Sequence, residues 1–292
     1  MSFHQAMSAT ETVTFRCADD FPLTGTLFSS AAANGRAVVI ASAMGVPRRF
    51  YAPLASFLAD QGFKVLTFDN RGIGDSRDGP VRGAKIRMED WGRLDIEAAL
   101  QWAGSQLNAT HLFLLGHSAG GQLAGLAPST TKLAGVVFAA VSSAYPGHWP
   151  MPSQLWLRYV MHAHVPVISA GRDFFPPKLG GLSNVPIPAG VTRQWARWAR
   201  KPGYLYDANN QIDLSGYRAL TQPLLAWQFD DDSYAPLSAH EAILAEYPNA
   251  KIERRQIRSR ELGRKIGHFG FFREPSREPF WRETADWLRK TG

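Results

Sequence analysis

The chain has a single cysteine, Cys17, and lacks any long run of apolar residues. One cysteine cannot form an intramolecular disulfide, which excludes a disulfide-stapled fold and favours a reducing compartment. A membrane-spanning helix needs about twenty consecutive apolar residues, and no segment offers them. Residues 1–14 are polar and lack the apolar centre of a secretion signal. We therefore expect a cytoplasmic protein without a membrane span.

Charged residues are also few, at 20% of the 292 residues, whereas apolar residues make up 45%. This balance is ordinary for a folded globular protein and argues against disorder. The length predicts one large domain, or one domain that carries an insertion.

The formal net charge of +7 is concentrated near the end of the sequence, where residues 251–290 contain twelve Lys or Arg and six Asp or Glu. The densest part of this segment comprises Arg254, Arg255, Arg258, Arg260, Arg264 and Lys265. Proteins that bind single-stranded nucleic acids tend to place aromatic residues between their basic ones, which this part does not. We expect a solvated basic face near an anionic substrate or partner, and no binding of nucleic acid.

Strand patterns alternate with helical patterns along most of the chain. After a predicted β-hairpin within residues 12–28, buried strands are predicted at 36–43, 64–68, 111–115, 133–141, 223–229 and 251–257. Helices are predicted at 50–58, 88–106, 237–247 and 279–290, and from residue 119 onward. This alternation predicts a mostly parallel sheet with helices on both faces.

The alternation stops over residues 144–217. This segment holds nine prolines and several aromatic residues, shows no strand pattern, and favours helices at 152–161 and 191–200. We therefore predict a core formed by residues 1–143 and 218–292, interrupted by an insertion at 144–217.

The sharpest motif is Gly116-His117-Ser118-Ala119-Gly120, placed where a buried strand gives way to a helix. A serine in such a tight turn projects its hydroxyl above the edge of the sheet, provided that small neighbours let strand and helix approach closely. This setting favours Ser118 as a nucleophile over a merely structural turn.

The motifs together resemble those of the α/β-hydrolase superfamily, over about residues 12–290. Residues 69–76, Asp-Asn-Arg-Gly-Ile-Gly-Asp-Ser, are similar to the turn that follows its fourth strand. Residues 43–51 and 267–272 resemble a lid-bearing subgroup of largely uncharacterised bacterial proteins. The resemblance implies an eight-stranded, mostly parallel sheet, with residues 144–217 as a helical lid inserted after the sixth strand.

The resemblance also implies the partners of the serine. His268, in a glycine-flanked loop after the last predicted strand, matches the position of the catalytic base. Asp232 aligns with the catalytic acid through the spacing to Pro236, although Asp231 remains an alternative. His117 is adjacent to the serine, but neighbours at a sharp turn point apart, so we interpret it as a residue packed against the sheet.

The oxyanion hole of this superfamily uses two backbone amides, which the resemblance places at Met44 and Ala119. The usual His-Gly before the first of these is replaced here by Ser42-Ala43. A backbone donor does not depend on those side chains, so its function is expected to survive.

The predicted function is a serine hydrolase that cleaves a carboxylic ester or related acyl bond. A thioesterase, an amidase or an acyltransferase would use the same residues, and a non-catalytic ligand-binding member of the fold is a further alternative. A serine in the turn disfavours dehalogenases and epoxide hydrolases, which carry aspartate there. No cluster has the spacing of metal ligands, so no metal or cofactor is expected. The aromatic insertion favours a small acyl substrate with an apolar or aromatic group.

Overall fold

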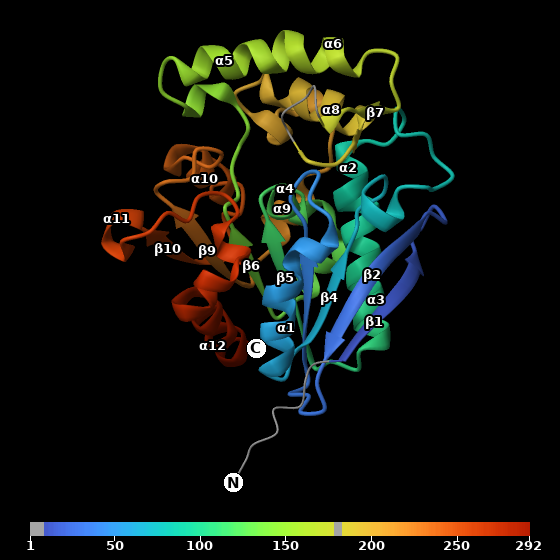
Figure 1. Cartoon of the computed structure of the whole chain (residues 1–292), viewed down its shortest axis with the longest axis vertical. Helices are drawn as coiled ribbons and strands as arrows, with labels where there is room; N and C mark the ends of the chain where they lie inside the picture. The colour runs from blue at the N-terminus through green and yellow to red at the C-terminus, as the bar shows by residue number, and fades with distance from the viewer. Residues whose placement is uncertain (1–8, 178–182) are drawn as a thin grey trace.

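The structure of the protein is a computed structural model, which describes residues 9–177 and 183–292. Its centre is an eight-stranded sheet in the order β1-β2-β4-β3-β5-β6-β9-β10 (Figure 1). Strand β2 runs antiparallel to β1 and β4, and all other neighbours are parallel. This confirms the predicted mostly parallel sheet. The strands are β1 (Ala9–Arg16), β2 (Pro22–Ser29), β3 (Arg36–Ala41), β4 (Lys64–Phe68), β5 (His111–His117), β6 (Gly135–Ala139), β9 (Pro223–Phe229) and β10 (Lys251–Ile257).

Helices cover both faces of this sheet, because alternate residues of the central strands point to opposite sides. Val38 and Ile40 of β3 pack into one apolar cluster with α1 and α12, whereas Val39 belongs to a second cluster with α3 and α10. Both clusters are buried, which explains why the central strands are predominantly apolar on both faces. The core helices are α1 (Ala52–Asp60), α2 (Met88–Asp90), α3 (Glu97–Gln106), α4 (Ala119–Gln122), α10 (Leu237–Leu244), α11 (Ser259–Leu262) and α12 (Arg282–Lys290).

The insertion between β6 and β9 lies across the top of the sheet in Figure 1, at the end away from the N-terminus. Its helices are α5 (Ser153–Tyr159), α6 (Val165–Ser169), α8 (Ala189–Ala199) and α9 (Ser215–Ala219). A π-helical turn, Val160–His164, joins α5 to α6, so this helix continues beyond the predicted end at 161.

The structure corrects two local predictions. The insertion does contain strands, β7 (Phe174–Phe175) and β8 (Ile187–Pro188), which pair with each other. Two residues are too few to produce an alternating pattern in the sequence. The helix predicted from Ala119 has only four residues, two of them the weak helix formers Gly120 and Gly121. Within the described ranges, no helix has both the length and the apolar character needed to cross a membrane.

Candidate active site

Ser118 occupies a strained turn between β5 and α4. Its backbone has φ 49° and ψ −114°, in a region that costs a non-glycine residue about 1–3 kcal/mol. Hydrogen bonds hold the turn: the Ser118 N–H donates to the Ala139 carbonyl at 3.1 Å, and its own carbonyl accepts from Gly121 at 3.0 Å. A Cβ on Gly120 would lie 2.3 Å from the Ala41 carbonyl oxygen. The small residues are therefore required by close packing against β3.

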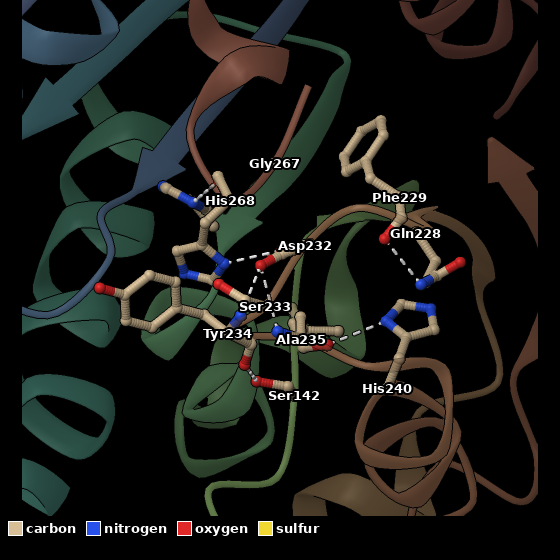
Figure 2. A network of polar contacts seen from close by, with 12 residues as sticks. Ser142, Gln228, Phe229, Asp232, Ser233, Tyr234, Ala235, His240, Gly267 and His268 are labelled. Atoms are coloured by element: carbon tan, nitrogen blue, oxygen red, sulfur yellow. Dashed lines mark hydrogen bonds and ion pairs between the residues drawn. The ribbon is translucent and has the colours of Figure 1, made fainter. Parts of the chain in front are cut away.

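His268 and Asp232 meet on neighbouring loops at the same end of the sheet. His268 Nδ1 donates to Asp232 Oδ2 at 2.8 Å, and Figure 2 shows the two side chains facing each other. The other oxygen of Asp232 accepts from the backbone amides of Tyr234 (2.8 Å) and Ala235 (3.1 Å). Three donors hold this buried carboxylate, so its direction toward the imidazole is set by the loop itself.

The two preceding aspartates have different partners. Asp231 accepts from the amides of Ile266 (2.8 Å) and Gly267 (3.0 Å), the two residues just before His268. Asp230 accepts from the amide of Ser259 at the start of α11, and this bond lowers its pKa. The structure thus brings Asp232 to the imidazole and uses Asp231 to hold the backbone that carries it.

His117 links the turn to the loop of His268. Its Nε2 donates to the backbone carbonyl of His268 at 2.9 Å, and its Nδ1 lies 2.9 Å from the hydroxyl of Tyr51. That hydroxyl in turn accepts from the amide of Ala43 at 2.8 Å. Burial lowers the pKa of His117 well below its usual value, so the ring is neutral. A neutral ring satisfies the network only if Nε2 carries the proton and Tyr51 donates to Nδ1.

The Met44 amide lies in a tight turn that follows β3. The Val46 N–H donates to the Ala43 carbonyl at 3.1 Å, and Gly45 has φ +70°, which glycine adopts without strain. The insertion contacts this turn, because the Ser183 hydroxyl donates to the Gly45 carbonyl at 2.7 Å. Ala119 is the first residue of α4, where an N–H has no acceptor within its helix.

The loop of the aspartates is also tied to the insertion. Trp149 of the insertion donates through Nε1 to the Ser233 carbonyl at 2.7 Å, and the hydroxyl of Ser142, just before the insertion, donates to the Tyr234 carbonyl at 2.9 Å. The exposed ring of Tyr234 lies 5.2 Å from the His268 ring, between centroids. Trp149 and Tyr234 therefore form part of the rim around His268.

Sequence reasoning missed two residues of this site. Tyr51 belongs to the motif at 43–51, but nothing in that motif indicated a bond to His117. The sequence indicates Asp231 only as an alternative acid. Its hydrogen bonds to the amides of residues 266–267 join two loops that are distant in the chain, and no local pattern predicts them. His117 is fully buried, in agreement with its interpretation as a residue packed against the sheet. It also forms hydrogen bonds to Tyr51 and to the backbone of His268.

A mostly parallel eight-stranded sheet with helices on both faces and a strained serine turn after β5 defines the α/β-hydrolase class. The expected membership of this superfamily is confirmed by a family match. Residues 32–184, just over half of the chain, match the family described as serine aminopeptidase, S33, and the chain belongs to that family. No curated protein sequence matches this chain.

Solved structures share the fold over nearly the whole chain at low sequence identity. A hypothetical protein from Pseudomonas aeruginosa is 14% identical, with a TM-score of 0.68 over 100% of this chain and 98% of that one. The α/β hydrolase GrgF from Penicillium sp. sh18 is 18% identical, with a TM-score of 0.65 over 97% and 99%. An esterase from Exiguobacterium antarcticum is 17% identical, with a TM-score of 0.64 over 96% and 100%.

Proposed function

We propose that this protein is a serine hydrolase that cleaves a carboxylic ester or related acyl bond through an acyl-enzyme intermediate. The observation that carries the proposal is the 2.8 Å hydrogen bond from His268 Nδ1 to Asp232. Because Nδ1 carries the proton in this bond, Nε2 of the neutral ring is the nitrogen that can accept a proton. Ser118 is the nucleophile, His268 the general base and Asp232 the acid that orients it. The esterase from Exiguobacterium antarcticum has the same fold, which favours an ester among the acyl bonds.

The reaction follows from these positions. Ser118 Oγ attacks the substrate carbonyl while His268 accepts the hydroxyl proton through Nε2. The amides of Met44 and Ala119 donate to the oxyanion that forms. His268 then returns the proton to the leaving oxygen, and a water molecule activated by the same imidazole hydrolyses the acyl-enzyme. Asp232 stabilises the imidazolium in both halves of the reaction.

The segment 144–217 acts as a lid in this proposal. Its Trp149 touches the loop of the aspartates, and its Ser183 touches the turn that carries Met44. An acyl group held under it would meet apolar and aromatic side chains, so we propose a small substrate with an apolar or aromatic group. Substitutions there are expected to change chain-length preference more than reactivity toward a small acetyl ester.

An amidase or peptidase is the second candidate, because the family description names an aminopeptidase. Recognition of a free ammonium group requires a carboxylate close to the substrate. The proposed lid, residues 144–217, holds three acidic residues: Arg82 binds Asp173 at 2.8 Å, Lys201 binds Asp207 at 3.3 Å, and Asp213 accepts from the Ser215 amide at 2.9 Å. This favours the ester over the peptide. Thioesterase and acyltransferase activity, and non-catalytic binding, remain alternatives that the same experiment separates.

The test is covalent labelling by a fluorophosphonate probe, combined with turnover of a chain-length series of nitrophenyl esters. Wild type and a control, Ser105→Ala on the exposed side of α3, should both be labelled and active. Ser118→Ala should lose labelling and lower kcat by about 10⁴-fold or more. Turnover of aminoacyl nitroanilides, measured in parallel, tests the amidase or peptidase alternative. Turnover of acyl thioesters tests the thioesterase alternative.

Labelling that persists in Ser118→Ala would show that another residue is the nucleophile. A folded wild type that neither reacts with the probe nor turns over any of these substrates would favour a ligand-binding protein instead.

A further inference from the structure

The long helix of the insertion exposes an unusual amount of apolar surface. Helices α5 and α6, with the π-turn between them, lie as one rod along the outer edge of the molecule (Figure 1). Helix α5 has no buried residue. Of the eight exposed large apolar side chains in the described ranges, five belong to residues 151–167: Met151, Leu155, Trp156, Tyr159 and Val167.

We call these five exposed side chains the outer stripe (Met151, Leu155, Trp156, Tyr159 and Val167). Leu155 and Tyr159 lie four residues apart on α5 and so share one side of the helix, and Met151 precedes the helix by two residues. The Trp156 and Tyr159 rings contact each other with centroids 5.4 Å apart, and they are 61% and 51% exposed. Large apolar patches on soluble proteins mark interaction sites.

The helix is held firmly in this orientation. Its inner side buries Val160, Met161 and Val165. Two arginines fix its backbone from below: Arg200 donates to the Met161 carbonyl at 2.9 Å, and Arg193 donates to the Ser169 carbonyl at 3.0 Å. The outward position of the stripe is therefore imposed by packing on the opposite face of the same helix.

Charge around the stripe identifies the kind of partner. Residues 151–167 contain Arg158 and no acidic residue, and the next acid along the chain, Asp173, is bound by Arg82 at 2.8 Å. Exposed Arg158 lies within the stripe, and exposed Arg172 follows the end of α6. An outward Trp–Tyr pair flanked by cations is typical of helices that lie in the interface of an anionic membrane.

The same charges disfavour a second copy of this chain as the partner. In a twofold contact the outer stripe would face itself, and Arg158 would meet a surface that has no carboxylate to pair with it. An anionic lipid surface supplies both the apolar interior for the rings and the negative charge for the arginines.

We propose that the outer stripe docks this protein onto anionic lipid surfaces, with the axis of α5–α6 parallel to the membrane plane. Docking leaves the loops of His268 and Asp232 in place, because their hydrogen bonds involve no residue of the stripe. The proposal concerns binding alone and does not depend on the proposed esterase activity.

The experiment is cosedimentation of the full chain with vesicles of phosphatidylcholine alone or mixed with phosphatidylglycerol. Wild type should bind the anionic vesicles about tenfold more strongly than the neutral ones, and less strongly as salt rises. The triple variant Leu155→Gln/Trp156→Gln/Tyr159→Gln should lose about tenfold or more of this binding. Arg158→Gln should reduce the preference for anionic lipid. Leu262→Gln, an exposed leucine on α11, is the matched control and should bind like wild type.

Thermal unfolding checks that the variants are folded, which is expected because the substituted side chains are exposed. Wild type that does not bind anionic vesicles overturns the proposal, and so does binding that survives the triple substitution. Light scattering after size exclusion tests the alternative partner. A wild-type dimer that becomes monomeric in the triple variant, without vesicle binding by either, would assign the stripe to self-association instead.

Discussion

The phenol oxygen of Tyr51 lies 2.9 Å from Nδ1 of His117, and both side chains are completely buried. Through this pair, the amide of Ala43 on one loop is connected to the carbonyl of His268 on another. The turn that carries Met44 and the loop that carries the proposed base are thus joined by hydrogen bonds through His117, the residue before Ser118. Tyr51 and His117 are positioning residues in this arrangement.

Tyr51→Phe is expected to lower kcat by about tenfold with little change in KM. The substitution removes one oxygen and leaves the Ala43 amide and His117 Nδ1 without their buried partner, which should also cost about 2 kcal/mol of unfolding free energy. Misalignment of the turn that carries Met44, the proposed oxyanion donor, would weaken contacts made mainly in the transition state, so kcat changes rather than KM. Steady-state kinetics and urea unfolding measure the two effects.

Tyr247→Phe is the matched control for this prediction. Tyr247 is equally buried, but its hydroxyl makes one long bond of 3.4 Å, to the Gly121 carbonyl, and none to His117. It should lose less stability and keep wild-type kcat. Equal losses of kcat in both variants would mean that Tyr51 acts only through general stability.

The three consecutive aspartates should respond very differently to replacement by asparagine. Asp232→Asn keeps the shape but favours the wrong imidazole tautomer, a change that costs about 10⁴-fold in serine proteases. Asp231→Asn keeps only one acceptor oxygen for the two amides of residues 266–267, so an intermediate loss of about tenfold is expected. Asp230→Asn touches only the exposed start of α11 and should stay near wild type. If Asp231→Asn loses most of its kcat while Asp232→Asn stays active, Asp231 is the acid.

The pH dependence of stability should depend on His240. Burial lowers the pKa of this ring, whose Nδ1 donates to the Val141 carbonyl at 2.9 Å (Figure 2). Below about pH 6.5 the unfolded chain takes up a proton that the folded chain does not, so stability is lost as pH falls. His240→Gln should flatten this decline by up to about 1.4 kcal/mol per pH unit. Urea unfolding between pH 7.5 and 5.5 measures it, and identical slopes in both proteins would contradict it.

Two glycine-to-alanine substitutions should have opposite signs. At Gly120 the new methyl would lie 2.3 Å from a backbone oxygen of β3, which cannot move aside, so a loss of about 3 kcal/mol or more is expected. At Gly104, on the exposed side of α3, the nearest atom is 4.0 Å away and helix propensity should add about 1 kcal/mol. Chemical denaturation of both variants tests the pair, and a neutral Gly120→Ala would show that the turn is looser than its packing indicates.

The sheet and the serine turn could be predicted from sequence because both depend on local order. Apolar strands of five to seven residues have a recognisable composition, and a turn of Gly116 to Gly120 after β5 requires small residues at fixed positions. The two-residue strands of the insertion could not be predicted, because their pairing comes from contact between β7 and β8 rather than from any pattern.

What the sequence by itself determined is therefore the class of fold and the place of Ser118 in the turn after β5, and its motifs predicted His268 as the partner of that serine. Only the tertiary structure decided which of three adjacent aspartates faces that imidazole, that Tyr51 and His117 join two loops, and that Trp156 of α5 points outward. The reason is physical. Local patterns report backbone propensity and burial, whereas these contacts join residues far apart in the chain, and their atoms meet only after the strands have set the relative positions of the loops.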